Sequence, residues 1–142
     1  MRNLSICFLF VGILAFSGIL YAQDENRHYF VATTYERVFP EGGSQAELDS
    51  LGHFFNENAI KKNEFILSEQ VLRHAWGHNS TDFVVIQEFK NWADIEKSGN
   101  RNVELIKEAI PDDKERQKYY MEFGKYFGNK HSDEIYQGMI AK

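Results

Sequence analysis

The segment Phe83-Val-Val-Ile-Gln-Glu-Phe89 constrains the fold more than any other part of the sequence. Short runs of β-branched and aromatic residues that follow a turn-rich stretch, here residues 77–82, are typical of strands. A strand with one solvated face alternates apolar and polar residues, whereas residues 83–86 are all apolar. Both faces of the sheet that contains this strand are therefore expected to be buried.

Three further strands are expected around this segment. Residues 28–38 are rich in aromatic and β-branched side chains, which indicates a first strand. Residues 65–76 form a second strand, joined to the 83–89 strand by a turn, as in an antiparallel hairpin. Residues 132–142 are interpreted as a last strand, with a docked turn as the alternative.

One helix is expected between the first two strands. Ser44-Gln-Ala-Glu47 is a capping box, in which Ser44 accepts from the N–H of Glu47 and Glu47 reaches back to Ser44. Leu48, Leu51 and Phe55 then recur at helical spacing and would form one apolar face.

Helical patterns also occupy most of the stretch after Phe89. Asn91 can cap a short helix over residues 92–97, which Ser98-Gly99 would stop. Residues 102–110 are amphipathic. Pro111 suits the first turn of a last helix that runs to Phe127 and ends at Gly128-Asn129.

This order of elements predicts an α+β domain. It reads β-α-β-β-α-β, with helices packed on one face of an antiparallel sheet. One chain of this size supplies helices for one face only. A second copy of the chain is the economical cover for the other face, so we expect a homodimer.

The first 22 residues are typical of a secretory signal peptide. Arg2 provides the basic start, an apolar stretch runs from Leu4 to Leu20, and Ala22 is the expected cleavage point. A membrane anchor is the alternative. Residues 23–142 would then form a single domain, secreted or periplasmic, with no membrane attachment after cleavage. That domain contains no cysteine, which excludes disulfides and zinc thiolate sites.

The charge pattern excludes two classes of partner. The formal net charge is −5, and the 16 Lys and Arg residues are scattered along the chain without a stripe. Phosphate backbones and anionic membrane surfaces both require clustered positive charge. Nucleic acid and anionic membrane surfaces are therefore not expected as partners.

The chain resembles the dimeric α/β-barrel family, whose subunits have the ferredoxin-like fold. The resemblance rests on the element order and on Glu88-Phe-Lys-Asn-Trp-Ala-Asp94, which would open a short helix after the third strand. Residues 130–136 also look like a segment of uncharacterised secreted bacterial proteins of this kind, which implies no known activity. The family includes haem-degrading and quinol-type monooxygenases, polyketide cyclases and members without an established reaction. The resemblance implies a fold and a homodimer, and it cannot choose the chemistry.

His74 is the first candidate for a catalytic residue. His74 and His78 are four residues apart, which on a strand separates them by about 13 Å, too far for one metal ion. No metal site is therefore assigned. His74 alone, near a strand end, could point into a pocket as an acid, a base or an axial ligand. The alternative is a structural histidine at the corner of a hairpin.

Glu88 and Tyr35 are the other two candidates. A buried carboxylate needs a partner, and Arg73 or Arg37 could supply it for Glu88. Glu88 near His74 would serve as a general base, with a structural ion pair as the alternative. Tyr35 could donate a hydrogen bond to a carbonyl or phenolate, and a half-exposed strand tyrosine is the alternative.

Two other patterns are assigned structural roles. His131-Ser-Asp133 contains three triad residue types, but neighbours in sequence do not converge as a triad requires. An aromatic face at helical spacing is expected to form core or dimer contacts rather than a ligand wall. Its members are Tyr119, Tyr120, Phe123, Tyr126 and Phe127.

Two functions follow from these patterns. The first is an exported homodimer that binds a small, mostly apolar organic molecule and acts on it by acid–base chemistry, as a monooxygenase or cyclase would. The second is a binding or structural module without catalysis, whose sheet face is filled by packing. A haem-binding enzyme is a narrower third alternative, and no cofactor is assigned.

Overall fold

The computed structural model describes residues 27–78 and 80–139, so the predicted signal peptide lies outside the described residues. None of the described helices is long and apolar enough to cross a membrane. The elements in chain order are β1 (Arg27–Arg37), α2 (Gln45–Asn58), a short 3-10 turn η1 (Ile60–Lys62), β2 (Ser68–Arg73), β3 (Asp82–Phe89), α3 (Trp92–Ala109), α4 (Asp113–Gly124) and β4 (Phe127–Met139).

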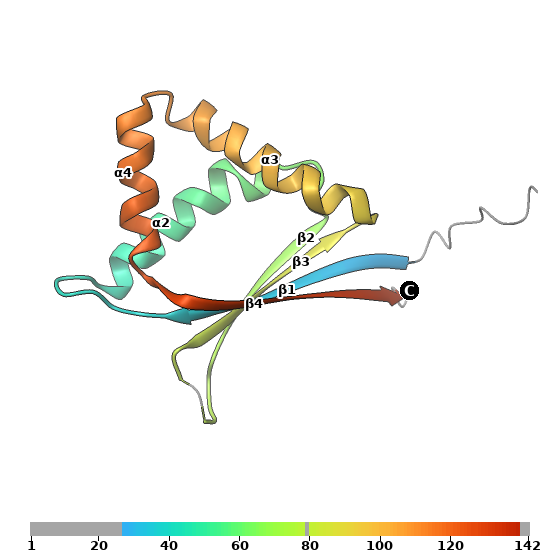
Figure 1. Cartoon of the computed structure of the whole chain (residues 1–142), viewed down its shortest axis with the longest axis horizontal. Helices are drawn as coiled ribbons and strands as arrows, with labels where there is room; N and C mark the ends of the chain where they lie inside the picture. The colour runs from blue at the N-terminus through green and yellow to red at the C-terminus, as the bar shows by residue number, and fades with distance from the viewer. Residues whose placement is uncertain (1–26, 79, 140–142) are drawn as a thin grey trace, which may run out of the picture.

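The four strands form one antiparallel sheet in the order β2-β3-β1-β4. The predicted α+β class and the antiparallel hairpin of β2 and β3 are confirmed. Figure 1 shows all three helices on one side of this sheet, while the β2–β3 hairpin bends away to the other side. This is the ferredoxin-like arrangement, with helices on one face of the sheet and, among residues 27–78 and 80–139, no helix on the other.

The helix boundaries differ from those expected after β3. Trp92–Ala109 is one continuous helix, because the Ser98 hydroxyl donates to the Ile95 carbonyl within the turn (2.8 Å) instead of ending it. Asn91 caps it as predicted, through the N–H of Asp94. The last helix begins after Asp112 and ends at Gly124, so the predicted stop at residues 128–129 is wrong.

The strand lengths also differ from those expected. β2 begins only at Ser68, because the N–H of Phe65 turns back onto the Asn63 side-chain oxygen (3.1 Å). β4 is confirmed as a strand, but it begins at Phe127 rather than at residue 132, because it pairs with nearly the whole length of β1. Residues 140–142 lie outside the described part of the chain.

A buried tyrosine joins the helix layer to the sheet at one end. Tyr126 lies just before β4 and is fully buried. Its hydroxyl accepts the N–H of Ser44 (3.0 Å) and donates to the Glu47 carboxylate (2.5 Å). Its carbonyl accepts the N–H of Val38, which follows β1 (2.9 Å). The first turn of α2 and the end of α4 are thereby fixed to the edge of the sheet.

A buried asparagine makes the equivalent connection at the other end. Asn63 is 3% exposed and follows η1. Its amide donates to the Ser98 carbonyl (2.9 Å) and to the Asn102 side chain (2.7 Å), both on α3. Asn63 therefore connects the segment between α2 and β2 to α3.

The buried apolar cluster lies between helices rather than on the sheet. Ala59, Leu105 and Ile106 form it, with Phe54, Phe55 and Tyr119 packed against it. The helices thus hold one another in place, and the polar contacts at the two ends fix them to the sheet. The middle of the sheet is left without a packed helical cover.

We predict that Asn63→Ala lowers the free energy of unfolding by roughly 2–3 kcal/mol, because it leaves the Phe65 N–H without its partner and removes both hydrogen bonds from the buried amide to α3. Asn100→Ala is the matched control, since Asn100 is exposed on α3 and its replacement should change stability by less than about 0.5 kcal/mol. Urea unfolding of both variants tests this. Equal stabilities would show that Asn63 does not fix the helix layer.

Candidate functional site

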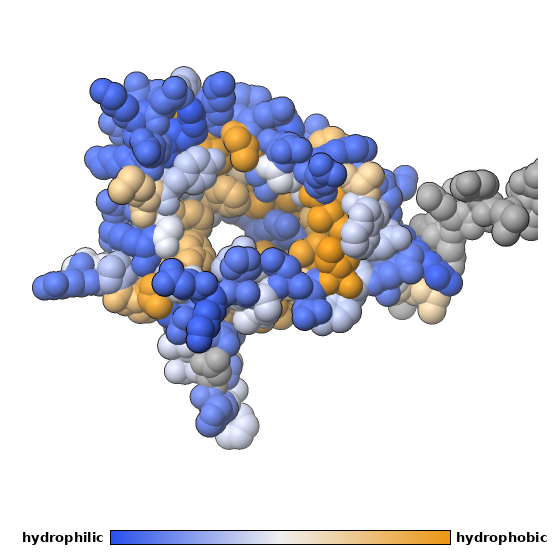
Figure 2. All heavy atoms as spheres, viewed as in Figure 1, coloured by the Kyte–Doolittle hydropathy of each residue, from blue (hydrophilic) through white to orange (hydrophobic). Residues whose placement is uncertain are grey.

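A cavity of about 770 Å³ lies between the sheet and the helices α2 and α4. In Figure 2 an opening passes between the helix layer and the sheet, and apolar residues form much of its wall. The cavity is the space that the end contacts leave over the middle of the sheet. Its size lies within the usual range of about 300–1,000 Å³ for small-molecule sites.

Side chains of successive strand pairs form the floor of the cavity in three rows. The register places Arg73, Phe83 and Tyr35 in the first row and Val71, Val85 and Thr33 in the second. Glu69 and Gln87 make up the third. All of these side chains project from the helix-covered face, because side chains two apart on a strand share a face.

The walls of the cavity are mostly apolar. Leu48 and Phe55 of α2, and Tyr120 and Phe123 of α4, face the floor together with Phe127 of β4. Gly52 also lines the cavity, and nothing lies within 4 Å of where its Cβ would be. Part of the predicted aromatic face therefore lines a cavity, whereas Tyr126 and Tyr119 serve packing as expected.

Tyr35 lies at the centre of an aromatic group in the first row. Its ring stacks on Phe83, with centroids 5.3 Å apart, and meets Phe127 edge-on at 5.4 Å. Burial raises the pKa of the Tyr35 phenol above its ordinary value, and the charges of Asp133 and Glu69 raise it further, against a hydrogen bond with Thr33. The phenol therefore stays protonated and can donate a hydrogen bond to a ligand oxygen.

A histidine–aspartate pair on β4 adjoins Tyr35. The ring of His131 stacks near that of Tyr35, at 6.0 Å between centroids. The Nε2 of His131 lies 3.4 Å from the Asp133 carboxylate, whose other oxygen accepts the Thr33 hydroxyl (2.8 Å). Asp133 thus orients the imidazole and is itself held by β1. Both side chains are a little over half exposed, at the open edge of the sheet.

Two arginines lie at the end of the cavity nearest the hairpin. Arg73 donates to the Asp49 carboxylate (2.6 Å), which also accepts from Gln45 (2.9 Å). These hydrogen bonds lower the pKa of Asp49 below its ordinary value, and the charge of Arg37 contributes. Arg37 donates to the Gln45 side-chain oxygen (3.2 Å).

The far row of the floor contains a single acid. Glu69 of β2 accepts a hydrogen bond from the amide of Gln87 (2.7 Å). Both line the cavity at the end away from the arginines. A ligand group at that end would meet a carboxylate and an amide.

Glu88 lies on the opposite face of the sheet from Tyr35. It is paired with His28, whose Nδ1 lies 2.6 Å from one carboxylate oxygen, and with Ser68, whose hydroxyl donates to the other (2.5 Å). The hydrogen bonds from Ser68 and His28 lower the pKa of Glu88. The prediction that Arg37 or Arg73 pairs with Glu88 is wrong, because both arginines project from the helix-covered face of the sheet. The alternative of a structural ion pair fits this geometry.

His74 lies outside the cavity. It is exposed, follows the last residue of β2, and sits against the hairpin, where a Cβ on Gly77 would come within 3.1 Å of its Nε2. Glu88 pairs with Ser68 at the other end of β2, so the expected closeness of His74 and Glu88 is wrong. His74 therefore cannot be an axial ligand to a group in the cavity, and its catalytic role stays a prediction.

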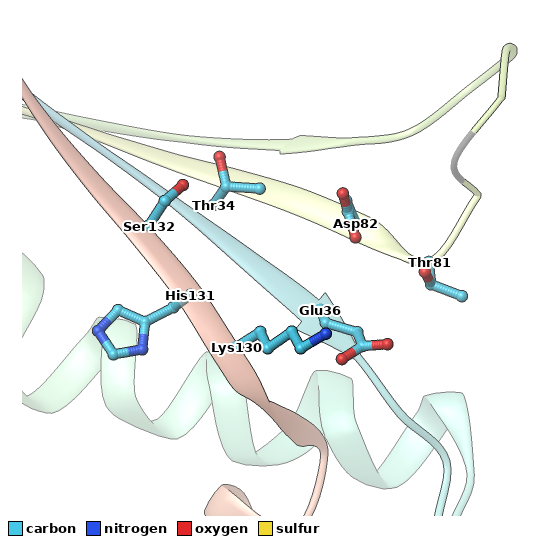
Figure 3. A pocket seen from close by; sticks show the side chains of 7 residues that line it. All are labelled: Thr34, Glu36, Thr81, Asp82, Lys130, His131 and Ser132. Carbon is cyan, nitrogen blue, oxygen red and sulfur yellow. The ribbon is translucent and has the colours of Figure 1, made fainter.

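A second, shallower pocket of about 330 Å³ is lined by successive residues of β4, whose side chains project from opposite faces of the sheet. In Figure 3 Thr34 and Ser132 project to one side of the sheet and His131 to the other, toward the helices. Ser132 therefore cannot join His131 and Asp133 in a triad, as expected. The sequence analysis missed the pairing of His131 with Asp133, although residues two apart on a strand lie on the same face, which was the available signal.

The described residues contain no group of three side chains suited to a metal ion.

The comparisons with known proteins support the fold and nothing finer. No protein-family model matches the sequence, and no curated protein matches it significantly. A nipsnap family protein of unknown function from Agrobacterium tumefaciens is similar in structure, with a TM-score of 0.55 and 10% identity, over 80% of this chain and 90% of that one.

Two proteins from Nitrosomonas europaea are also similar in structure. One, of unknown function, has a TM-score of 0.53 and 12% identity, over 83% of this chain and 95% of its own. The other, described as a candidate antibiotic biosynthesis monooxygenase, has a TM-score of 0.51 and 18% identity, over 84% of this chain and 95% of its own. These likenesses agree with the ferredoxin-like α+β fold of the chain.

We predict that Tyr35 ionises above the ordinary tyrosine pKa of about 10. The difference in absorbance near 295 nm between the wild type and Tyr35→Phe, followed through an alkaline titration, isolates this phenol. Asp133→Asn should move its midpoint down, because it removes a negative charge that opposes ionisation. A midpoint at or below 10 in the wild type would contradict the assignment of Tyr35 as a protonated donor.

Proposed function

We propose that the protein is an exported, homodimeric binding protein for a small, mostly apolar organic molecule, held in the cavity between the sheet and the helices. The observation that carries this proposal is the unfilled cavity of about 770 Å³ with mostly apolar walls. Protein interiors are normally packed without voids of this size. The proposed export rests on the signal-peptide pattern of residues 1–22.

Acid–base chemistry on the bound molecule is the second part of the proposal. Tyr35 would donate a hydrogen bond to a ligand carbonyl or phenolate oxygen. His131 lines the shallower pocket, and its ring lies 6.0 Å from that of Tyr35, so it would accept a proton from a ligand that extends past Tyr35. The carboxylate of Asp133 would stabilise the resulting imidazolium. This is the type of proton transfer with which a monooxygenase- or cyclase-like reaction begins. A binding protein without catalysis is the alternative.

These two versions differ in whether bound ligand exchanges protons. If the protein carries out acid–base chemistry, a bound ligand with an acidic C–H group should exchange that hydrogen with D2O. His131→Ala should slow this exchange by about a hundredfold or more, which is the usual contribution of a general base. Proton NMR of the ligand measures this rate. Exchange that His131→Ala leaves unchanged would favour the non-catalytic version.

Filling the cavity provides the test of binding. We predict that Gly52→Leu weakens binding of the neutral fluorescent probe Nile red, because the new side chain enters the cavity and takes up part of its volume. The same change should raise stability by about 0.5–1 kcal/mol, since glycine is a poor residue inside a helix. Probe fluorescence and urea unfolding give the two readouts.

Gly99→Ala is the matched control for this variant. Gly99 also lies within a helix, has nothing within 4 Å of its Cβ position, and does not line the cavity. It should gain similar stability and bind Nile red as the wild type does. Failure of the wild type to bind any neutral apolar probe would contradict the proposed function.

The open face of the sheet supports the proposed homodimer. Alternation along the strands directs Phe30, Val84 and Ile86 to the face without helices. Leu72 and Tyr136 on the same face are 48% and 55% exposed. The described residues cover only one face of the sheet, and a second copy placed face to face would bury these side chains.

We predict that Ile86→Lys converts the dimer to a monomer, because it places a charge in the middle of the proposed interface. Val103→Lys is the control, since Val103 is 61% exposed on α3, in the helix layer, and should leave the dimer intact. Light scattering during size-exclusion chromatography measures both. A monomeric wild type would contradict the dimer without affecting the cavity.

A further inference from the structure

The charges that face the cavity are separated along its length. Arg37 and Arg73 lie at the hairpin end, and Asp49 is the carboxylate that lies between them. The oxygens that Arg37 contacts are neutral, namely the Gln45 side chain at 3.2 Å and the Ser80 carbonyl at 3.5 Å. Two guanidinium groups therefore share one carboxylate, and this end of the cavity has a surplus positive charge.

The two other acids of the site, Glu69 and Asp133, are held by groups other than the arginines. Glu69 precedes Arg73 by four residues on β2, a separation of about 13 Å along a strand. The Glu69 carboxylate accepts from the Gln87 amide (2.7 Å), although its charge still reaches Tyr35. Asp133 is held by Thr33 and His131 at the β4 edge. Neither acid pairs with Arg37 or Arg73, so the guanidinium groups can still donate to a ligand.

Arginine at such a position is suited to a carboxylate. The planar guanidinium can donate two parallel hydrogen bonds to the two oxygens of a carboxylate. Tyr35 lies in the same row as Arg73, with Phe83 between them, and its protonated phenol adds a further donor to this row. Between this end and Glu69 the floor is apolar, with Val71 and Val85 in the middle row and Phe123 opposite.

We infer that the cavity takes a small amphipathic carboxylate, whose carboxylate binds Arg37 and Arg73 and whose apolar body lies over Val71 and Val85. This inference rests on the proposed function, because it names the chemical class of the ligand for the same cavity. The arginines select the acid over neutral molecules of the same shape. The apolar rows provide most of the contact area.

The test compares two probes of one shape, 2-naphthoate and 2-naphthalenemethanol, by isothermal titration calorimetry at 150 mM salt. The acid should bind the wild type about ten- to a hundredfold more tightly than the alcohol, the usual effect of a charge-assisted hydrogen bond. In Arg37→Gln this preference should fall to about threefold or less, while the alcohol still binds. Retained alcohol binding shows that the variant is folded.

Lys90→Gln is the matched control for charge. Lys90 is exposed just after β3, at the opposite end of that strand from the arginines, and its replacement removes the same charge from the protein. The preference for the acid should persist in this variant. Equal loss in both variants would mean that net charge alone favours the acid, and the inference would be wrong.

The remaining outcomes separate the inference from the proposed function. If acid and alcohol bind the wild type equally well, the carboxylate class is wrong and the cavity remains a binding site. If neither probe binds and Nile red does not bind either, the proposed function fails and the inference fails with it. Arg73→Gln provides a second variant in which the same loss of preference is expected.

Discussion

The fixed separation between the helices and the middle of the sheet is the constraint on which the rest of the structure depends. Two polar contacts set it. Tyr126 joins the start of α2 to the sheet next to β4. Asn63, which follows the end of α2, joins that end to α3. Buried polar groups are stable only with partners, so both contacts fix directions as well as distances. The helices bury apolar surface against one another around Ile106, and the space over the sheet stays empty.

Strand alternation then divides the chemistry of the sheet between its two faces. Tyr35 and Phe83 face the helices, while Phe30 and Glu88 of the same two strands face away. The helix-covered face forms the floor of the cavity. The opposite face carries the apolar surface that we propose a second subunit covers, together with the Glu88–His28 pair. A shift of one residue in register would exchange these roles.

The electrostatics of the cavity follow from the same rows. Tyr35 is kept protonated by burial and by nearby carboxylates, so it acts as a hydrogen-bond donor. The arginines collect at the hairpin end, and Glu69 lies at the other end beside Gln87. An apolar middle separates the two ends. This polarity gives the cavity a direction, which is what a binding site needs to orient an asymmetric ligand.

The sequence by itself determined the class of the fold, because periodicity and capping are local. The Ser44 cap of α2, the hydrophobic run of β3 and the hairpin before it are sufficient for an α+β sheet with helices on one side. The reciprocal half of the predicted capping box is wrong, because the N–H of Ser44 donates to the Tyr126 hydroxyl instead of to Glu47. Tyr35 as a site residue also follows from its place on a strand. Tertiary packing decided the rest. Ser98-Gly99 was expected to end a helix, but the amide of Asn63, from a distant part of the chain, binds the Ser98 carbonyl and keeps this turn helical. The grouping of His131, Asp133 and Tyr35 depended on the pairing of β4 with β1 across about a hundred residues, which no local pattern records.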